Sequence, residues 1–476
     1  GMIMKFKKLT RKRIKDLLPF FKAQNLHLAN FSAGFLFMWN KYISPEYAIY
    51  GDTLILKERY VNNVYFHYPL CLSGDEYCER QAISELEKYC RENKIRIHYT
   101  NVPKSRLASL VIRYGSDVHV ANQRRWRDYL YYASDFKTYA GGNYSGQRNH
   151  VNKFKKSFPD YEFHVCEQSD ACGVLAFFEE YESYQLAKGE FSATEEMKAA
   201  KEILPYLKDL GLLCGYLTVG GKIVAASIGE RCGDMLIIHI EKALRDYPGA
   251  YPTVAQLFAQ TFADENVHYI NREDDSGDLG LRKSKLNYLP VEIVDKYNLA
   301  IRRSIDALSK LPEIGSERVI LAPVPNGDAA QYARLARDTE LNRFWGYDWR
   351  DDAKGKDVSD AWFLNSARKD FKKKEEMPLG IYLDGKLAGE VILFNFGFLS
   401  EAEIGIRLLP EYRGRGLAKE SLSAYMRYGF SKLGLEKIEA KCYKENVASE
   451  KALLSAGMRR IGEDDTFYYF YKTAAM

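Results

Sequence analysis

The sequence predicts an α/β (α+β) protein built from three similar units, each a mixed, mostly antiparallel twisted sheet flanked by helices. A run of alternating strand and tight-turn patterns occurs three times, over residues 47–70, 215–243 and 380–409. A helical pattern follows each run, at about 75–91, 251–264 and 415–433. One more strand pattern follows each helix. The first turns of the three runs are about 165 residues apart, which indicates an architectural repeat.

The turns of the three runs carry strong hairpin signals. Gly51-Asp52, Gly220-Gly221 and Asp384-Gly385 each separate two alternating apolar segments, and such pairs favour tight two-residue turns. Further turns are expected at Asn62-Asn63, at Cys232-Gly233 and near Gly397. The closing strands are expected at 95–100, 267–272 and 437–443.

A chain of 476 residues exceeds one ordinary domain. Composition shifts near 130 and 310 predict three units at 1–130, 131–305 and 312–476, the first two forming one front module. The second boundary is the better marked, because "SKLPEIGSERVILAPVPNG" carries three prolines and a fresh strand start.

Composition excludes several classes of protein. The net charge of +5 permits an anionic ligand without requiring nucleic acid. The sequence has no apolar run of the ~18 to 20 residues that a membrane span needs and no signal-peptide core, so a cytoplasmic location is expected. The eight cysteines form no Cys-x-x-Cys pair, which indicates reduced thiols and no metal site.

The stretch "LLPEYRGRGLAKESL", residues 408–422, lies where the third unit passes from a strand to a helix. Arg413, Gly414, Arg415, Gly416, Leu417 and Ala418 are expected to form a loop with outward backbone N–H groups at a helix N-terminus. Such a loop binds phosphate. Glycines let the ligand approach the backbone, and arginines add charge-assisted hydrogen bonds.

The order strand, Arg-x-x-Gly-x-Ala, helix, strand, "KENVASEKALLSAGM" resembles the GNAT acetyltransferase superfamily over about residues 317–474. Arg413, Gly416 and Ala418 fill the superfamily's pyrophosphate signature. Asn446 and Ser449 match its Asn-x-x-Ser beside the cofactor arm. The resemblance implies acetyl-CoA as donor and, as acceptor, a small amine or the amino terminus of a peptide or protein.

The resemblance also suggests a catalytic base. Some members carry a base glutamate on the strand before the loop, where this chain has Glu403. An exposed carboxylate paired with Arg407 would explain the same residue. Many members protonate the departing thiolate with a tyrosine where this chain has Leu453, so the unit is closer to the ribosomal-protein acetyltransferase branch. Tyr443 lies nearby on the preceding strand.

The front module resembles uncharacterised relatives of the phosphatidylglycerol lysyltransferase C-terminal domain over most of residues 5–300. The resemblance rests on "RDYLYYASDFKTYAGGNYSGQRNHVNKFKKSF" and on "INREDDSGDLGLRKSKLNYLPV". That family is a tandem of two GNAT-like folds and moves an aminoacyl group from tRNA to a lipid headgroup. This chain lacks the membrane helices of those enzymes, which puts the lipid acceptor in doubt. The basic helix in "QRNHVNKFKKSF" would serve tRNA, or is simply a solvated face.

The phosphate loop does not recur in the second unit. "LRDYPGAYPTVAQLF" keeps Gly249, but Pro252 removes an amide donor, so we expect no CoA there. Charged residues instead crowd the ends of two strands: Glu241, Lys242, Arg272, Glu273 and Asp275. They indicate either a site for a polar, amine-bearing or phosphorylated substrate or a solvated ion network, and they are expected to form paired networks around a solvent-filled pocket.

The sequence thus predicts an acetyl-CoA-dependent N-acetyltransferase fused to an aminoacyltransferase-like module. Two alternatives stay open. The front module is an aminoacyl-tRNA-dependent transferase with the rear unit auxiliary, or it is a non-catalytic module that presents the acceptor.

Overall fold

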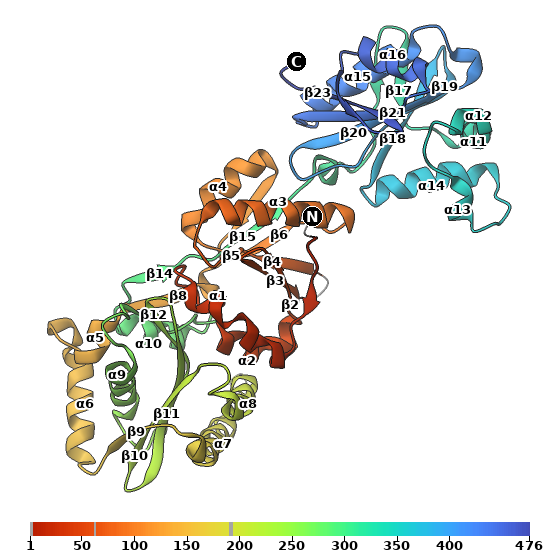
Figure 1. The fold of residues 1–476 in the computed structure, drawn as a ribbon. Coiled ribbons are helices and arrows are strands. Elements are labelled where there is room, and N and C mark those ends of the chain that lie inside the picture. Colours follow the sequence, from red (N-terminus) through yellow and green to blue (C-terminus); the bar gives the residue numbers. More distant parts are fainter. Residues whose placement is uncertain (1–2, 61–62, 190–193) are drawn as a thin grey trace. The chain divides into compact units, whose positions relative to one another are not determined.

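A computed structural model describes residues 3–60, 63–189 and 194–476. The chain divides into two compact units (Figure 1). We call residues 1–110 with 120–300 the front unit, and residues 111–119 with 301–476 the rear unit. The described residues form three mixed sheets flanked by helices, which confirms the predicted fold class. The three domain boundaries drawn from the sequence stay a prediction.

The first sheet of the front unit has the strand order β1-β2-β3-β4-β6-β15-β7, and β5 pairs with β3. Its strands are β1 (Lys7–Lys8), β2 (Glu46–Tyr50), β3 (Thr53–Tyr60), β4 (Asn63–His67), β5 (Leu70–Cys71), β6 (His98–Val102), β7 (Val118–Ala121) and β15 (Tyr297–Ile301). Its helices are α1 (Leu18–Ala23), α2 (Ala33–Ile43), α3 (Glu76–Glu92) and α4 (Lys104–Tyr114). The boundary between the two units falls within α4, β7 and β15. Strand β15 therefore returns to the first sheet after the second sheet is complete. Part of the turn predicted at Asn62-Asn63 lies outside the described residues.

The second sheet has the order β14-β8-β13-β12-β11-β10-β9. Its strands are β8 (Asp128–Tyr132), β9 (Glu162–Val165), β10 (Leu213–Val219), β11 (Lys222–Cys232), β12 (Met235–Ala243), β13 (Tyr269–Asn271) and β14 (Glu292–Val294). The helices are α5 (Ala133–Thr138), α6 (Ser145–Ser157), α7 (Ala171–Ala187), α8 (Thr194–Ile203), α9 (Ala250–Phe262) and α10 (Leu279–Asn287). Strand β12 alternates its side chains between two cores, because Leu236 packs with Phe258 of α9 and Ile237 with Phe177 of α7.

The sheet of the rear unit has the order β16-β17-β18-β19-β20-β21-β23-β22. Its strands are β16 (Ile314–Gly315), β17 (Val319–Ala322), β18 (Glu376–Leu383), β19 (Lys386–Phe394), β20 (Glu401–Leu408), β21 (Lys437–Tyr443), β22 (Arg459–Glu463) and β23 (Phe467–Thr473). The helices are α11 (Ala329–Arg337), α12 (Thr339–Asn342), α13 (Trp349–Ala353), α14 (Asp360–Lys372), α15 (Leu417–Ser431) and α16 (Val447–Ser455).

Left-handed turn residues join the hairpins as the sequence predicts. Asp384 and Gly385 have φ of 51° and 78°, and Gly220 and Gly221 have φ of 56° and 80°. Two consecutive residues with positive φ match the twist of the flanking strands. In the rear unit, such a turn joins β18 to β19, and β20 pairs with β19. Strand β20 ends at Leu408, just before the glycine loop that the sequence predicts.

Candidate functional site

The loop between β20 and α15 presents a row of unpaired backbone donors. A single turn of 3-10 helix, Pro410–Tyr412, follows β20, and Gly414 and Gly416 then both adopt a left-handed backbone with φ of 75°. Within the described residues, the N–H groups of 414–418 donate no hydrogen bond. Since α15 begins at Leu417, these donors lie at a helix N-terminus, where backbone dipoles favour an anion.

The space above the two loop glycines is open. A methyl group at Gly414 would meet no atom within 4 Å, and one at Gly416 would meet only Nη2 of Arg318, at 3.3 Å. At both positions the backbone is left-handed, so any residue larger than glycine would be strained there. A ligand can therefore approach the backbone here as closely as the sequence predicts.

The side chains of this loop differ in their exposure to solvent. Arg413 and Arg415 are exposed, and the Arg415 guanidinium lies 5.6 Å from the centre of the Tyr412 ring. Leu417 is buried in the core of the rear unit, so only its backbone faces the loop. The arginines can therefore add charge to the site, while Leu417 anchors it.

A brace between Arg318 and Glu420, which the sequence does not reveal, holds the loop in place. The Arg318 guanidinium donates from Nε to Glu420 at 2.8 Å and from Nη1 to the Arg415 carbonyl at 2.7 Å. The N–H groups of Arg318 and Val319 also donate to Glu420. Burial alone would raise the pKa of Glu420, but these hydrogen bonds lower it overall. The brace uses a carbonyl of the loop and leaves its N–H groups open.

Strands β20 and β21 separate beside the loop. They pair in parallel only from Glu401 to Glu403, opposite Lys437 to Glu439. Strand β20 then continues to Leu408 and β21 to Tyr443 without further pairing between them. Residues 404–408 pair with β19 on one edge, so only their backbone groups that face β21 are left without a strand partner, next to the loop that follows.

Glu403 lies on β20 at the point where the strands separate. Its carboxylate accepts a hydrogen bond from Asn395 Nδ2 at 3.2 Å. Arg407 donates instead to Glu390 at 2.9 Å, so the alternative that pairs Glu403 with Arg407 is wrong. Burial raises the pKa of Glu403, since a carboxylate is less stable when it is partly removed from water. A carboxylate with a raised pKa suits a general base.

A second carboxylate, which was not predicted from the sequence, lies on the same sheet face. Glu376 of β18 lies opposite Phe394, and Phe394 lies opposite Glu403. Directly opposed residues of neighbouring strands share a face, so both carboxylates lie on one side of the sheet. Burial and the nearby Asp370 carboxylate raise the pKa of Glu376 to about 7. No pattern in the sequence distinguishes Glu376 from its neighbour Glu375.

Asn446 and Ser449 lie at the start of α16. The Asn446 side chain accepts a hydrogen bond from the Ser449 N–H at 3.2 Å and so caps the helix. Leu453, one turn further on, is buried, and Tyr443 contacts Phe344 and Phe467 through its ring. Asn446 thus has a structural role that does not depend on a ligand.

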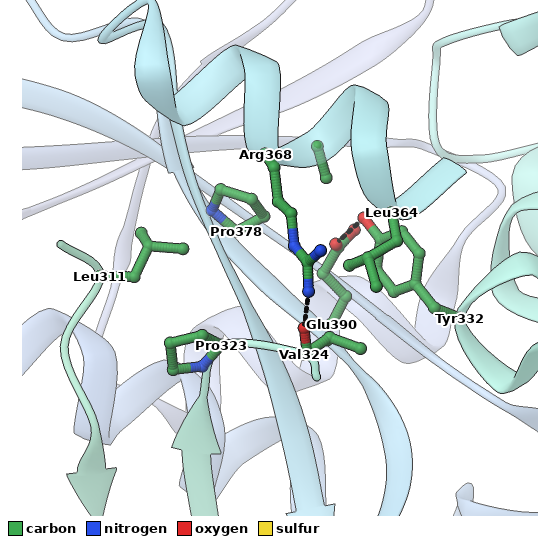
Figure 2. Close-up of a pocket in the computed structure, with 9 residues that line it drawn as sticks. Leu311, Pro323, Val324, Tyr332, Leu364, Arg368, Pro378 and Glu390 are labelled. Carbon is green, nitrogen blue, oxygen red and sulfur yellow. Dashed lines mark hydrogen bonds between the residues drawn. The ribbon is translucent and has the colours of Figure 1, made fainter. Parts of the chain in front are cut away.

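A cavity of about 40 Å³ lies between α11, α14 and the start of β18 (Figure 2). Its lining is largely apolar, and Arg368 at its edge donates to the Val324 carbonyl at 3.1 Å. Glu390 lines it while accepting hydrogen bonds from Tyr332 and Arg407. The lining includes no residue of the loop between β20 and α15.

In the front unit, two of the predicted site residues meet. Arg272, which follows β13, approaches Glu241 of β12 with Nη2 3.5 Å from Oε1, and the same nitrogen donates to the Tyr251 hydroxyl. Ser227 donates to Glu241 at 2.9 Å. Aromatic rings surround the guanidinium, the nearest being Tyr288 at 4.7 Å. Arg272 Nη1 is buried and has no partner among the described residues.

The other predicted front residues join separate networks. Glu273 lies 3.3 Å from His239 Nδ1, and His239 Nε2 lies 2.6 Å from Glu230. Burial alone would lower the pKa of His239, but the two carboxylates raise it to about 10. Asp275 accepts from Arg282 at 2.8 Å, and Lys242 pairs with Glu196 at 3.2 Å. Glu230 and His239 were not predicted, although Glu230 is a charge within an apolar strand.

Gly249 has a different use from the glycines of the rear loop. Its φ is 87°, and a methyl group there would meet the His150 carbonyl oxygen at 2.4 Å. Helix α6 therefore covers the start of α9, where Pro252 offers no N–H. This arrangement favours packing of two helices over binding of phosphate.

The described residues hold neither a cluster suited to a metal ion nor a helix suited to a membrane. Residues 3–60, 63–189 and 194–476 contain no group of three or more His, Cys, Asp or Glu side chains that could hold a metal ion. No helix within these ranges combines the length and the apolar character that crossing a membrane requires.

Family models match both parts of the chain. Residues 23–300 match "Phosphatidylglycerol lysyltransferase, C-terminal", and residues 318–459 match "Acetyltransferase (GNAT) domain". Both resemblances inferred from the sequence are therefore confirmed.

Individual relatives cover parts of the chain. It is 31% identical over 100 residues to the uncharacterized N-acetyltransferase YnaD of Bacillus subtilis, covering 21% of this chain and 58% of that protein. The uncharacterized N-acetyltransferase YoaA of the same organism is 28% identical over 156 residues, covering 32% and 85%. A solved structure of a conserved protein of unknown function from Bacteroides thetaiotaomicron is 27% identical with a TM-score of 0.58, covering 63% of this chain and 100% of that chain.

Proposed function

The chain belongs to the family of phosphatidylglycerol lysyltransferase C-terminal domains and carries a GNAT acetyltransferase domain behind it, and from this we propose that its rear unit is an acetyl-CoA-dependent N-acetyltransferase. The observation that carries the proposal is the row of unpaired N–H groups at 414–418. Open space lies over both glycines of that row.

The residues of the loop have distinct proposed roles. The N–H groups from Gly414 to Ala418 would bind the pyrophosphate of acetyl-CoA, since anions are stabilised at a helix N-terminus. Arg413 and Arg415 would add charge-assisted hydrogen bonds to its oxygens. Asn446 and Ser449 would lie beside the cofactor arm, with Asn446 keeping its capping bond.

Acetyl transfer requires a neutral amine. We propose that Glu403 takes the proton from the amine, directly or through water, because burial raises its pKa. The amine nitrogen then bonds to the acetyl carbon, the bond from that carbon to sulfur breaks, and the proton that the nitrogen loses goes to the departing thiolate to give CoA thiol. The acceptor we propose is a small amine or the amino terminus of a peptide or protein.

Replacing Gly416 with Val tests the cofactor site. The larger side chain would occupy the open space over the loop and would strain a backbone with φ of 75°. We expect calorimetry to show acetyl-CoA binding to the full chain with a Kd in the micromolar range, about −8 kcal/mol. The variant should bind at least roughly a hundredfold more weakly, a loss of about 3 kcal/mol.

A matched control is Gly385→Ala, which alters a hairpin turn with the same kind of backbone, φ of 78°. Its affinity for acetyl-CoA should equal that of the wild type. Unchanged binding in Gly416→Val would show that the loop does not hold the cofactor.

For the front unit we propose an aminoacyltransferase-like module. The unpartnered Arg272 Nη1 beside Glu241 supports a site for a polar or charged group. The rival proposals are transfer from aminoacyl-tRNA, with the rear unit auxiliary, and a non-catalytic module that presents the acceptor. Mass spectrometry of a cell extract incubated with the protein, with acetyl-CoA or aminoacyl-tRNA as donor, distinguishes the proposals for the front unit by the mass added.

We also propose the cytoplasm as the location of the protein.

A further inference from the structure

The opening between β20 and β21 has two faces, and the phosphate loop serves one of them. Ile404 of β20 packs in the same core as Leu417 and Leu422 of α15, so α15 and its loop belong to that face. Side chains alternate along a strand, so Glu403, Gly405 and Arg407 point to the opposite face. What covers this opposite face decides which molecules reach the opening from the side away from the loop.

A short segment, residues 342–346, which we call the strap, lies against β20 on this opposite face. The Trp345 ring lies close to Gly405: a methyl group at Gly405 would lie 3.7 Å from Cζ3 of Trp345, an ordinary van der Waals distance. The Arg407 guanidinium lies 4.4 Å from the centre of the same ring, within range of a cation–π interaction.

The same strap also contacts the end of β21. The Phe344 ring lies 5.6 Å from the ring of Tyr443, the last residue of that strand. A methyl group at Gly346 would lie 4.0 Å from the Tyr443 hydroxyl. Arg343 forms an ion pair with Glu445 at 3.0 Å, just beyond the strand. The strap therefore crosses from β20 to β21 over the part where the two strands no longer pair.

Buried hydrogen bonds hold the strap at its β20 end. Arg407 donates to Asn342 at 3.0 Å and to Glu390 at 2.9 Å, and the side chains of Arg407 and Glu390 are both buried. Asn342 in turn donates to the carbonyl groups of Leu335 and Ala336 at the end of α11. A charged group buried with its partners keeps one geometry, so the position of Trp345 is fixed from two sides.

We propose that Trp345 is a positioning residue of the acetyl-transfer site: it covers the acceptor side of the opening, keeps water out and packs against the carbon chain of the acceptor amine. The inference rests on the proposed function. Trp345 covers Gly405, two residues along the same face from Glu403. An amine with an apolar stem would lie on the ring and direct its nitrogen to the carboxylate. Such an acceptor is favoured over a purely polar amine.

Water competes with the amine for the same carbon. When water attacks the thioester, its oxygen bonds to the acetyl carbon and the carbon–sulfur bond breaks. The products are acetate, CoA thiol and a proton. Expelling water from the site suppresses this side reaction. The rate of hydrolysis without an amine therefore reports on the strap, independently of the identity of the acceptor.

The test compares the full-length wild type with Trp345→Ala and Phe344→Ala. Calorimetry first establishes that the wild type binds acetyl-CoA; absence of binding would refute the proposed function itself. With acetyl-CoA bound, thiol release without amine should rise by roughly fivefold in both variants, because water reaches the thioester. Acetyl-CoA affinity should change less than about twofold. Trp345→Phe should restore slow hydrolysis.

Trp349→Ala is the matched control, since Trp349 packs against Phe363 of α14 at 5.1 Å and not against β20. Its hydrolysis rate should equal that of the wild type. If Trp345→Ala and Phe344→Ala still bind acetyl-CoA and hydrolyse it at the wild-type rate, the inference is overturned. An equal rise in the Trp349 control would overturn it too, because general loosening of the unit would then be the cause.

Discussion

Single buried charges in the front unit are stabilised by partners placed around each of them. Arg272 meets Glu241 and a set of aromatic rings, and His239 lies between Glu230 and Glu273. Burying an ion costs several kcal/mol unless such partners satisfy it. Removing one member leaves the other uncompensated, so substitutions here should affect stability as well as any ligand.

Asp275 offers a test of this pairing through pH. Hydrogen bonds from Arg282 and Tyr129 outweigh the effect of burial and lower the pKa of Asp275 to about 2. A carboxyl group with a lowered folded pKa stabilises the protein above its unfolded pKa, near 4, and loses this effect as pH falls through about 2. Asp275→Asn should therefore lower the free energy of unfolding by about 2 kcal/mol at pH 7, and by less as pH falls below about 4.

Chemical denaturation between pH 7 and pH 3 measures this difference. Asp246→Asn, at an exposed position, is the control and should change the free energy of unfolding by less than about 0.5 kcal/mol at each pH. A cost in Asp275→Asn that stays constant down to pH 3 would contradict the role given to the ionised carboxylate.

Glu403 is the residue on which the proposed chemistry depends. Glu403→Gln should lower turnover by roughly 10²-fold with acetyl-CoA affinity unchanged, since only the proton acceptor is lost. The acidic limb of the pH profile of kcat/KM should disappear, because burial raises the pKa of this carboxyl group. Spermidine and a short peptide with a free amino terminus serve as trial acceptors. Glu439→Gln, opposite Glu403 in β21, should keep the acidic limb but move it to lower pH, because the Glu439 carboxylate helps to raise the pKa of Glu403.

At the scale of elements, local signals predicted the strand, the glycine loop and the helix of the rear unit. A strand, two glycines and a helix define the loop within fifteen residues, so the sequence shows it directly. The helix begins at Leu417 and not at 415, because Gly414 and Gly416 have a left-handed backbone that cannot belong to the helix. Arg318 and Trp345 could not be predicted, since their partners Glu420 and Gly405 are brought to them only by folding. The interpretation that paired Glu403 with Arg407 was wrong for the same reason, because folding brings Arg407 to the buried Glu390.

At the scale of the whole molecule, three related sheets share an order of elements but not a binding loop. The second and third sheets each place a helix after a hairpin strand, α9 after β12 and α15 after β20. Each helix begins beside a glycine with positive φ, Gly249 and Gly416. Similar architecture therefore does not by itself predict two cofactor sites.

The surroundings of the two glycines predict a single CoA site per chain. At Gly249 a methyl group would meet the His150 carbonyl at 2.4 Å, and Pro252 lacks an N–H; at Gly416 the space is open and the N–H groups of 414–418 are unpaired. Calorimetric titration of the full chain with CoA should thus give one site, which is lost in Gly416→Val. A second site per chain, or one that persists in that variant, would show that the front unit binds CoA and that the covered start of α9 opens to admit it.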